Sequence, residues 1–284
     1  MKMAKLITGT VFVGLLSLGV AGNVALAKDL RQQLSDVSVL TEIKKRGVIN
    51  VGHGSFVPWA FRSTKGKYVG FEIDIAKKLA DDMGVKFNSI PTAWDGIIPA
   101  LLAGKFDIII SGMSPSPKRA LTVSFTDSYS LPLQQGFVTN TKLASGMTKM
   151  EDYTKPSVTI VSRRGGMGEV TAKKNLPKAT HRLFDDDAMA FQEVLNGNAH
   201  GIFGQEPKPQ FWMLEFSDQV NKPFGKREFS EEPGASAAIR QGDTVMLTYF
   251  NNWINWRTGF IRERFEYWYT TDGWFGLDPK RANK

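Results

Sequence analysis

Two kinds of apolar spacing alternate along the chain from about residue 40 onward, and this alternation restricts the fold more than any other feature. Residues 48–51 form a short, mostly apolar run, which is typical of a strand. Phe71, Ile75 and Leu79 recur every four residues until Gly84, as on one face of a helix that a glycine ends. A further strand, helix and strand are predicted at 85–87, 97–102 and 106–110. The resulting βαβαβ order predicts an α/β fold with a parallel sheet.

A second set of such elements begins after residue 140. Strands are predicted at 158–161 and 199–203, and helices at 169–175 and from a capping Asp187 onward. The segments 102–109 and 195–202 can be laid over each other, because in both a helix ends at glycine and a strand follows. We therefore expect two similar lobes, each with a loop at the carboxyl end of a strand, where ligands bind in open α/β sheets.

The first 27 residues have the pattern of a cleavable export signal. Two lysines in Met1–Lys5 precede an uncharged apolar stretch, 6–22, and a small-x-small ending at Ala27. Cleavage after Ala27 predicts a chain free in a periplasm, and an uncleaved anchor helix is the alternative. The sequence has no cysteine, which excludes disulfides, a lipid anchor on cysteine and cysteine metal sites.

The composition excludes several classes of protein. Apolar residues make up 42% and charged residues 23%, which is ordinary for a globular protein and unlike a disordered or polytopic membrane chain. The formal charge of +8 includes two leader lysines and predicts a mild preference for anionic ligands. We predict no nucleic-acid partner, no metal and no cofactor: basic runs are missing, three histidines are scattered, and Asp185–Asp187 lacks the pattern of a calcium loop and is interpreted as a capping turn.

The segment after the predicted strand 106–110 carries the most informative motif. It opens with Ser111, Gly112, Met113 and Ser114. A strand-to-helix loop with small residues lets backbone N–H groups approach an anion, and Ser116 followed by Pro117 predicts a capped helix start. Arg119 can make a planar, two-pronged contact with a carboxylate. The alternative is a capped surface helix with a solvated arginine.

Aromatic residues and a glycine cluster lie at other strand ends. Phe56, Trp59 and Trp94 follow the first two strands, where they can stack on a ligand or belong to the core. Gly165, Gly166, Met167 and Gly168 precede a predicted helix. These glycines allow close backbone approach, but no phosphate-loop Lys-Ser/Thr pair follows. The C-terminal Trp253, Trp256, Trp268 and Trp274 are predicted to pack a helix and the tail.

Five segments resemble, in order, the periplasmic amino-acid-binding proteins, the solute-binding protein family 3 of ABC importers. They are Gly70–Ala76, Trp94–Leu101, Phe106–Ser114, Arg119 and Phe125–Tyr129, within a resemblance that covers about 38–268. It implies a two-lobed periplasmic-binding-protein fold of type II, with the ligand cleft between lobes joined by two hinge segments. The implied parts are the leader 1–27, lobe 1 from 28–138 and 231–284, and lobe 2 from 139–230, with hinges near Gly136–Thr141 and Arg227–Ala235.

The resemblance also implies roles for single residues in the first lobe. Arg119 would hold the ligand's α-carboxylate, helped by the amides of Gly112 and Ser114. Ser111 or Gly112 would meet its amino group. The aromatic pair around the ligand would be Phe56 and Trp94.

In the second lobe the sequence departs from the family. Gly166 and Met167 match a loop that touches the carboxylate, but Met167 lacks the hydroxyl that many members carry there. Gln205, followed by Glu206, stands where the family carries an aspartate for the α-ammonium group. The predicted ligand is therefore a small carboxylate or amino-acid-like molecule. The protein is predicted to be a monomer that delivers this ligand to an ABC permease in the inner membrane.

Two other functions stay open. Gly165–Leu176 also resembles cyclohexadienyl dehydratase, an exported enzyme on the same fold that uses a glutamate as general acid. Lys208 matches the position of that acid, and Glu206 lies nearby. A lysine serves as an acid there only if burial lowers its pKa. The remaining alternative is a sensor or accessory binding protein without a transporter.

Overall fold

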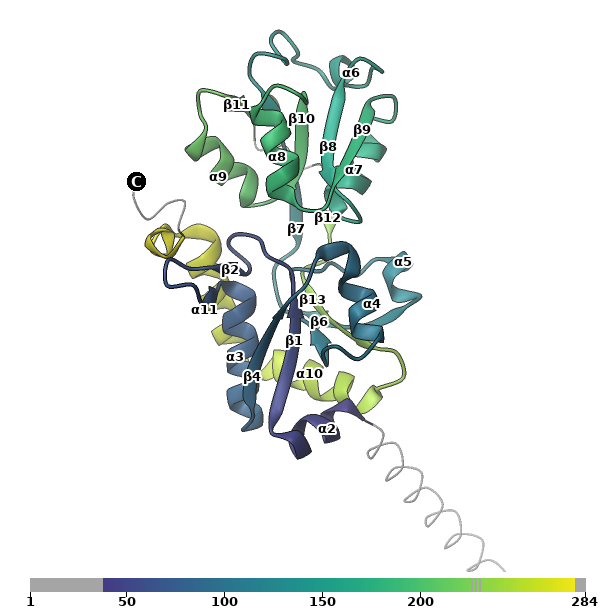
Figure 1. The fold of residues 1–284 in the computed structure, drawn as a ribbon, viewed down its shortest axis with the longest axis vertical. Coiled ribbons are helices and arrows are strands. Elements are labelled where there is room, and N and C mark those ends of the chain that lie inside the picture. The colour runs from purple at the N-terminus through teal and green to yellow at the C-terminus, as the bar shows by residue number, and fades with distance from the viewer. Residues whose placement is uncertain (1–37, 226, 228, 230, 279–284) are drawn as a thin grey trace, which may run out of the picture.

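The computed structural model describes residues 38–225, 227, 229 and 231–278, so the predicted leader lies outside the described residues. Its strands form two main sheets, each with its own helices, which make the lower and upper bodies of Figure 1. The first sheet has the order β4-β1-β5-β13-β6 and the second β11-β7-β10-β8-β9, with β12 on β7. We call the bodies the first and second lobe.

The first lobe holds both ends of the described chain. Its strands are β1 (Val48–His53), β4 (Lys86–Pro91), β5 (Ile108–Ile109), β6 (Val123–Ser128) and β13 (Ser236–Arg240), with a small hairpin of β2 (Phe61–Arg62) and β3 (Tyr68–Val69). Its helices are α2 (Val39–Arg46), α3 (Phe71–Met83), η1 (Trp94–Gly96), α4 (Ile97–Leu102), α5 (Pro117–Ala120), α10 (Thr244–Trp256), α11 (Thr258–Thr270) and η2 (Phe275–Leu277).

The second lobe is built from the middle of the chain. Its strands are β7 (Leu133–Asn140), β8 (Thr159–Arg163), β9 (Thr180–Phe184), β10 (Gly201–Gln205), β11 (Val220–Asn221) and β12 (Glu231–Glu232). Its helices are α6 (Met150–Tyr153), α7 (Met167–Asn175), α8 (Asp187–Leu195) and α9 (Lys208–Glu215). In each lobe three strands pair in parallel, β4-β1-β5 and β10-β8-β9, which confirms the predicted α/β fold.

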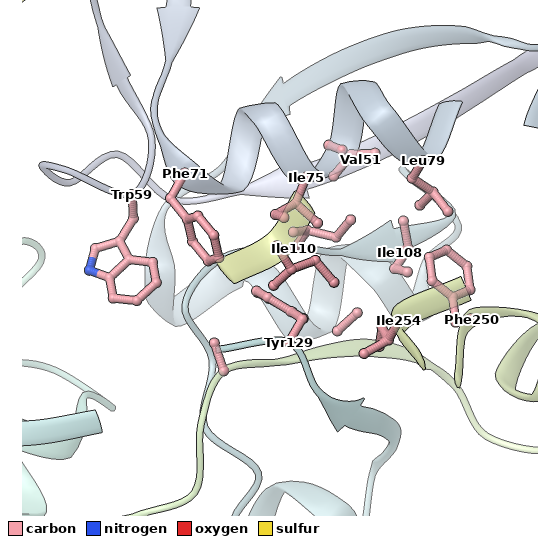
Figure 2. Close-up of a cluster of buried hydrophobic side chains, with 14 of the residues drawn as sticks. Val51, Trp59, Phe71, Ile75, Leu79, Ile108, Ile110, Tyr129, Phe250 and Ile254 are labelled. Atoms are coloured by element: carbon pink, nitrogen blue, oxygen red, sulfur yellow. The ribbon is translucent and has the colours of Figure 1, made fainter. Parts of the chain in front are cut away.

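The apolar face of α3 anchors the core of the first lobe. Phe71, Ile75 and Leu79 are buried against the sheet, as their spacing predicts, and Gly84 ends the helix in the left-handed conformation with φ +67°. Figure 2 shows these side chains facing Ile108 on β5 and neighbouring core residues. This packing fixes the carboxyl ends of β1 and β5, from which the loops of the site begin.

Three details of the predicted elements are wrong. The strand predicted at 106–110 is reduced to β5. The Asn50 amide donates its hydrogen bond to the Asp107 carboxylate at 2.7 Å, and not to a backbone carbonyl of that strand. Asp186, rather than Asp187, caps α8 by accepting from the Met189 amide. Trp256 is 82% exposed, whereas the other three C-terminal tryptophans are buried as predicted.

Two connecting segments lie side by side between the lobes. One joins β6 to β7 and the other joins β12 to β13. The Ser130 hydroxyl accepts the Ala235 amide at 2.8 Å, and a Cβ on Gly234 would lie 2.1 Å from the Ser130 carbonyl oxygen. The boundary predicted after residue 138 falls inside β7, which belongs to the second sheet from Leu133 onward.

Candidate ligand-binding cleft

A small cavity lies between the lobes, at the loops that follow β5, β8 and β10. Its lining from the first lobe is Trp94, Gly112, Ser114 and Arg119, and from the second lobe and β12 it is Gln135, Arg163, Gly166, Met167, Gly168, Asp187, Phe203, Gln205 and Glu232. The free volume is only about 20 Å³, so side chains fill the space between the lobes. Most residues that the sequence assigns to a ligand site therefore do meet at one place.

Arg119 reaches across the cleft from α5. Ser116 caps that helix by accepting the Arg119 amide, and Pro117 is its first residue, as predicted. The guanidinium donates to the Ser114 carbonyl at 2.7 Å and to the Gly165 carbonyl of the second lobe at 3.0 Å. Burial, and then the nearby charge of Arg163, lowers the pKa of Arg119 to about 10, against an opposite effect of Glu232. The side chain is thus a partly buried cation at neutral pH.

Trp94 makes the second contact between the lobes. It opens η1 after β4, and its indole N–H donates to the same Gly165 carbonyl at 3.2 Å. Gly165 has φ +68°, the left-handed region that favours glycine, and this conformation turns the loop after β8 toward the first lobe. One carbonyl oxygen of the second lobe therefore accepts hydrogen bonds from two side chains of the first.

The space beside the predicted aromatic pair is occupied by Arg163, the last residue of β8. Its guanidinium carbon lies 4.1 Å from the centre of the Trp94 ring and 5.4 Å from that of Phe56. The Lys208 ammonium at the start of α9 lies 5.0 Å from the Phe56 ring. Cations are attracted to aromatic faces at such distances. No motif in the sequence singles out Arg163, although the Arg163-Arg164 pair directly after a predicted strand is a signal for charge at that strand end.

Asp187 binds both of these cations. Its carboxylate lies 2.6 Å from the Lys208 ammonium and 3.4 Å from a terminal nitrogen of Arg163. Burial would raise the pKa of Asp187, but the charges of Arg163 and Lys208 outweigh it and hold that pKa below its usual value. Burial lowers the pKa of Lys208, against the effect of Asp187. The predicted capping role of the acidic turn thus belongs to Asp186 alone, while Asp187 faces the cleft.

Glu232 on β12 occupies another side of the cavity. It accepts from the Ser114 hydroxyl at 2.9 Å and from the Gln135 side-chain amide at 3.0 Å. Both donors come from different lobes, and Glu232 itself lies beside a connecting segment. Glu232 and Gln135 could not be predicted from the sequence, because neither belongs to a motif at a strand end.

The amide of Gly112, which the resemblance assigns to the ligand, is already bonded. It donates to the buried carboxyl of Glu72 at 2.7 Å, and the Tyr129 hydroxyl donates to the other oxygen of Glu72 at 2.7 Å. Ser111 is likewise engaged, because its hydroxyl accepts the Gly54 amide at 2.8 Å. These bonds hold the loop after β5 in shape, and Ser114 and Arg119 from the same segment line the cavity.

Six predicted site residues are not part of the cavity lining: Phe56, Ser111 and Gly165, and also Trp59, Met113 and Glu206. Trp59 is 1% exposed and packs against Phe71 on α3 and against α11, because the Phe56–Ala60 bridge turns the chain toward the core. Met113 is buried in the core beside α4. Glu206 forms an ion pair with Lys222 at 2.6 Å. By contrast, Gly166, Met167 and Gln205 line the cavity.

Comparison with known proteins places this geometry in a family. The profile of the bacterial extracellular solute-binding proteins, family 3, matches residues 49–271. Cyclohexadienyl dehydratase of Pseudomonas aeruginosa is 27% identical over 241 residues, 81% of this chain and 86% of that protein. The crystal structure of the ancestral amino-acid-binding protein AncCDT-1, a precursor of cyclohexadienyl dehydratase, is 38% identical over 82% of this chain and 100% of its own, with a TM-score of 0.73.

A second solved structure has a bound ligand. It is a putative binding component of an ABC transporter from Wolinella succinogenes, complexed with lysine. It is 32% identical over 84% of this chain and 100% of its own, with a TM-score of 0.73. The family match includes every residue of the cavity and nearly all of both sheets. The chain therefore belongs to the bacterial extracellular solute-binding proteins of family 3, whose structural neighbours here are two-lobed.

Proposed function

We propose that this chain is the periplasmic receptor of an ABC importer and that it captures a small carboxylate or amino-acid-like ligand by closing its lobes. The observation that carries the proposal is Arg119, a partly buried cation between the lobes whose guanidinium donates to two neutral backbone carbonyls. Neutral partners leave its charge available to an anion, and a guanidinium pairs with a carboxylate through two parallel hydrogen bonds. Exclusion of water on closure strengthens that pair.

The connecting segments 129–132 and 233–235 are the proposed hinges. Rotation there opens the cavity, whose lining comes from both lobes, without breaking either sheet. The predicted leader supports export to a periplasm, and the Wolinella succinogenes neighbour supports a partner permease. None of the helices among residues 38–278 that the structure describes has the length and apolar character needed to cross a membrane.

A thermal-shift screen of residues 28–284 tests the proposal. The panel contains amino acids, dicarboxylates, aromatic acids and prephenate, because a ligand that binds the native state raises the melting temperature by mass action. We expect a shift with at least one acid, and we expect Arg119→Ala to abolish it through a loss of about 2–5 kcal/mol of binding free energy. A shift of equal size in Arg119→Ala would refute the central role of this residue.

The dehydratase remains a second candidate because of one observation. Lys208 stands where the resemblance places the catalytic acid, and burial lowers its pKa, as acid catalysis by a lysine requires. Its ammonium is, however, held by Asp187 at 2.6 Å. The same screen separates the two functions, because a dehydratase would form product from prephenate during incubation and a receptor would not.

A further inference from the structure

The cleft holds more cations than its carboxylates balance. Arg119, Arg163 and Lys208 line or border it, while Asp187 is shared between the last two. The remaining acid, Glu232, accepts hydrogen bonds from Ser114 and Gln135. Arg163 is also close enough to Arg119 for its charge to lower the pKa of Arg119. Like charges that approach each other in a closed cavity are stabilised when an anion enters between them.

Arg163 has an unused donor at this place. Its Nε is buried and finds no hydrogen-bond acceptor among the residues that the structure describes. A Cβ on Gly166, another residue of the cavity lining, would come within 3.4 Å of that nitrogen. A buried donor left unpaired carries a free-energy cost that an acceptor removes. The long contact of 3.4 Å from Arg163 to Asp187 leaves the guanidinium weakly held on its other side as well.

The same guanidinium decides which side chains fit beside the aromatic pair. It lies against Trp94 and near Phe56, in the space that the resemblance assigns to the ligand. A cationic ligand side chain, such as that of the lysine in the Wolinella succinogenes neighbour, would meet the charge of Arg163 there. Lys208 adds a second repulsive charge beside Phe56.

We infer that Arg163 and Lys208 form a second anion subsite and that the ligand carries two carboxylates, one on Arg119 and one on Arg163. The inference rests on the proposed function, because Arg119 supplies the first subsite. Asp187 then acts as a positioning residue, which holds Arg163 and Lys208 together without neutralising both. Recognition of a second carboxylate gives specificity against neutral and cationic amino acids.

Isothermal titration calorimetry of the wild-type chain tests the inference. The probes are succinate, glutarate, L-aspartate and L-glutamate, with L-glutamine, L-lysine and L-arginine as comparisons. We expect one of the four dicarboxylates to bind at least about tenfold more tightly than L-glutamine, L-lysine and L-arginine, since buried charge pairs contribute on this scale. Added salt should weaken the binding of the dicarboxylate more than the binding of L-glutamine.

Variants assign the effect to the subsite. Arg163→Gln should weaken the best dicarboxylate at least about tenfold and change binding of L-glutamine far less. The matched control is Arg164→Gln, which removes the exposed neighbouring charge and should leave all affinities unchanged. A melting temperature within the wild-type range shows that each variant is folded.

Three results would overturn the inference. They are tighter binding of L-lysine or L-arginine than of every dicarboxylate, equal losses for both ligand classes in Arg163→Gln, and no binding of any dicarboxylate. If L-glutamine still binds and Arg119→Ala abolishes that binding, the proposed function stands and the second subsite alone is wrong. If Arg119→Ala alters no affinity at all, the proposed function fails together with it.

Discussion

Glu72 links the core of the first lobe to the loop of the site. Its side chain is 0% exposed and accepts from the Gly112 amide and the Tyr129 hydroxyl. Burial raises the pKa of Glu72 to about 8, although both hydrogen bonds act in the opposite direction. Because the value for an unburied glutamate is 4.5, the folded protein holds a proton between about pH 4.5 and pH 8 that the unfolded chain has released.

The stability that this proton contributes is present at low pH and is lost as pH rises toward 8. Glu72→Gln mimics the protonated carboxyl, since its amide oxygen accepts from Gly112 and its NH₂ donates to Tyr129. We therefore predict that the free energy of unfolding of the variant, compared with that of wild type, increases from pH 5 to pH 9, so that the variant becomes relatively more stable. Urea denaturation at pH 5, 7 and 9 measures it, and parallel pH profiles would contradict the assignment.

At the residue scale, the sequence predicts those cavity residues whose side-chain type suits a ligand and which directly follow a strand or a capped turn. Arg119 was found because an arginine follows a capped turn at a strand end, and Trp94 because an aromatic follows a strand. For Trp59 the sequence left both a ligand contact and a core position open, and the residue lies in the core because its orientation depends on the bridge between Phe56 and Ala60, which no local pattern reveals. The position of Arg163 could not be predicted, because its contact with Trp94 depends on how the first lobe lies against the second.

At the scale of elements, Asp243 accepts hydrogen bonds at the N-terminal ends of two helices. It caps α10 by accepting the Met246 amide, and it also accepts the Val39 amide and the Ser38 hydroxyl at the start of α2. A single carboxylate thus serves donors of helices that are about 200 positions apart in sequence. The docking of α2 depends on this contact.

Asp243→Ala should therefore cost more than the loss of one cap. A single N-cap contributes ~0.5–2 kcal/mol, so we expect a loss larger than that of Asp186→Ala, which uncaps α8 alone. The free energy of unfolding in urea compares the two variants. Equal losses would show that the contacts of Asp243 with α2 contribute no stability.

The elements themselves follow from local patterns, and their ends follow less well. Helix α3 was predicted from its apolar spacing and its final glycine, because both signals are contained in the segment itself. The strand around β5 was overestimated, because the side chain of Asp107 replaces a backbone partner. The cap of α8 was misplaced by one residue, since three consecutive aspartates offer the same local signal.

At the scale of the whole molecule, the sequence predicts two lobes because the same order of elements occurs twice. The boundary between the lobes was predicted inside β7, because nothing in the sequence of this strand shows which sheet it joins. The contacts that bring the lobes together, from Arg119 and Trp94 to the Gly165 carbonyl, depend on tertiary geometry. Sequence alone therefore indicates the cleft without revealing that side chains fill it.

The most direct test of the account is a crystal structure of residues 28–284 with the acid that stabilises the protein most. We predict that its carboxylate lies between the lobes on the guanidinium of Arg119, with Arg163 displaced from its contact with Asp187 toward the ligand. A larger hollow of about 860 Å³ lies elsewhere, between α9 and the end of α11. Electron density for the ligand in that hollow, with the cleft unchanged, would contradict the account.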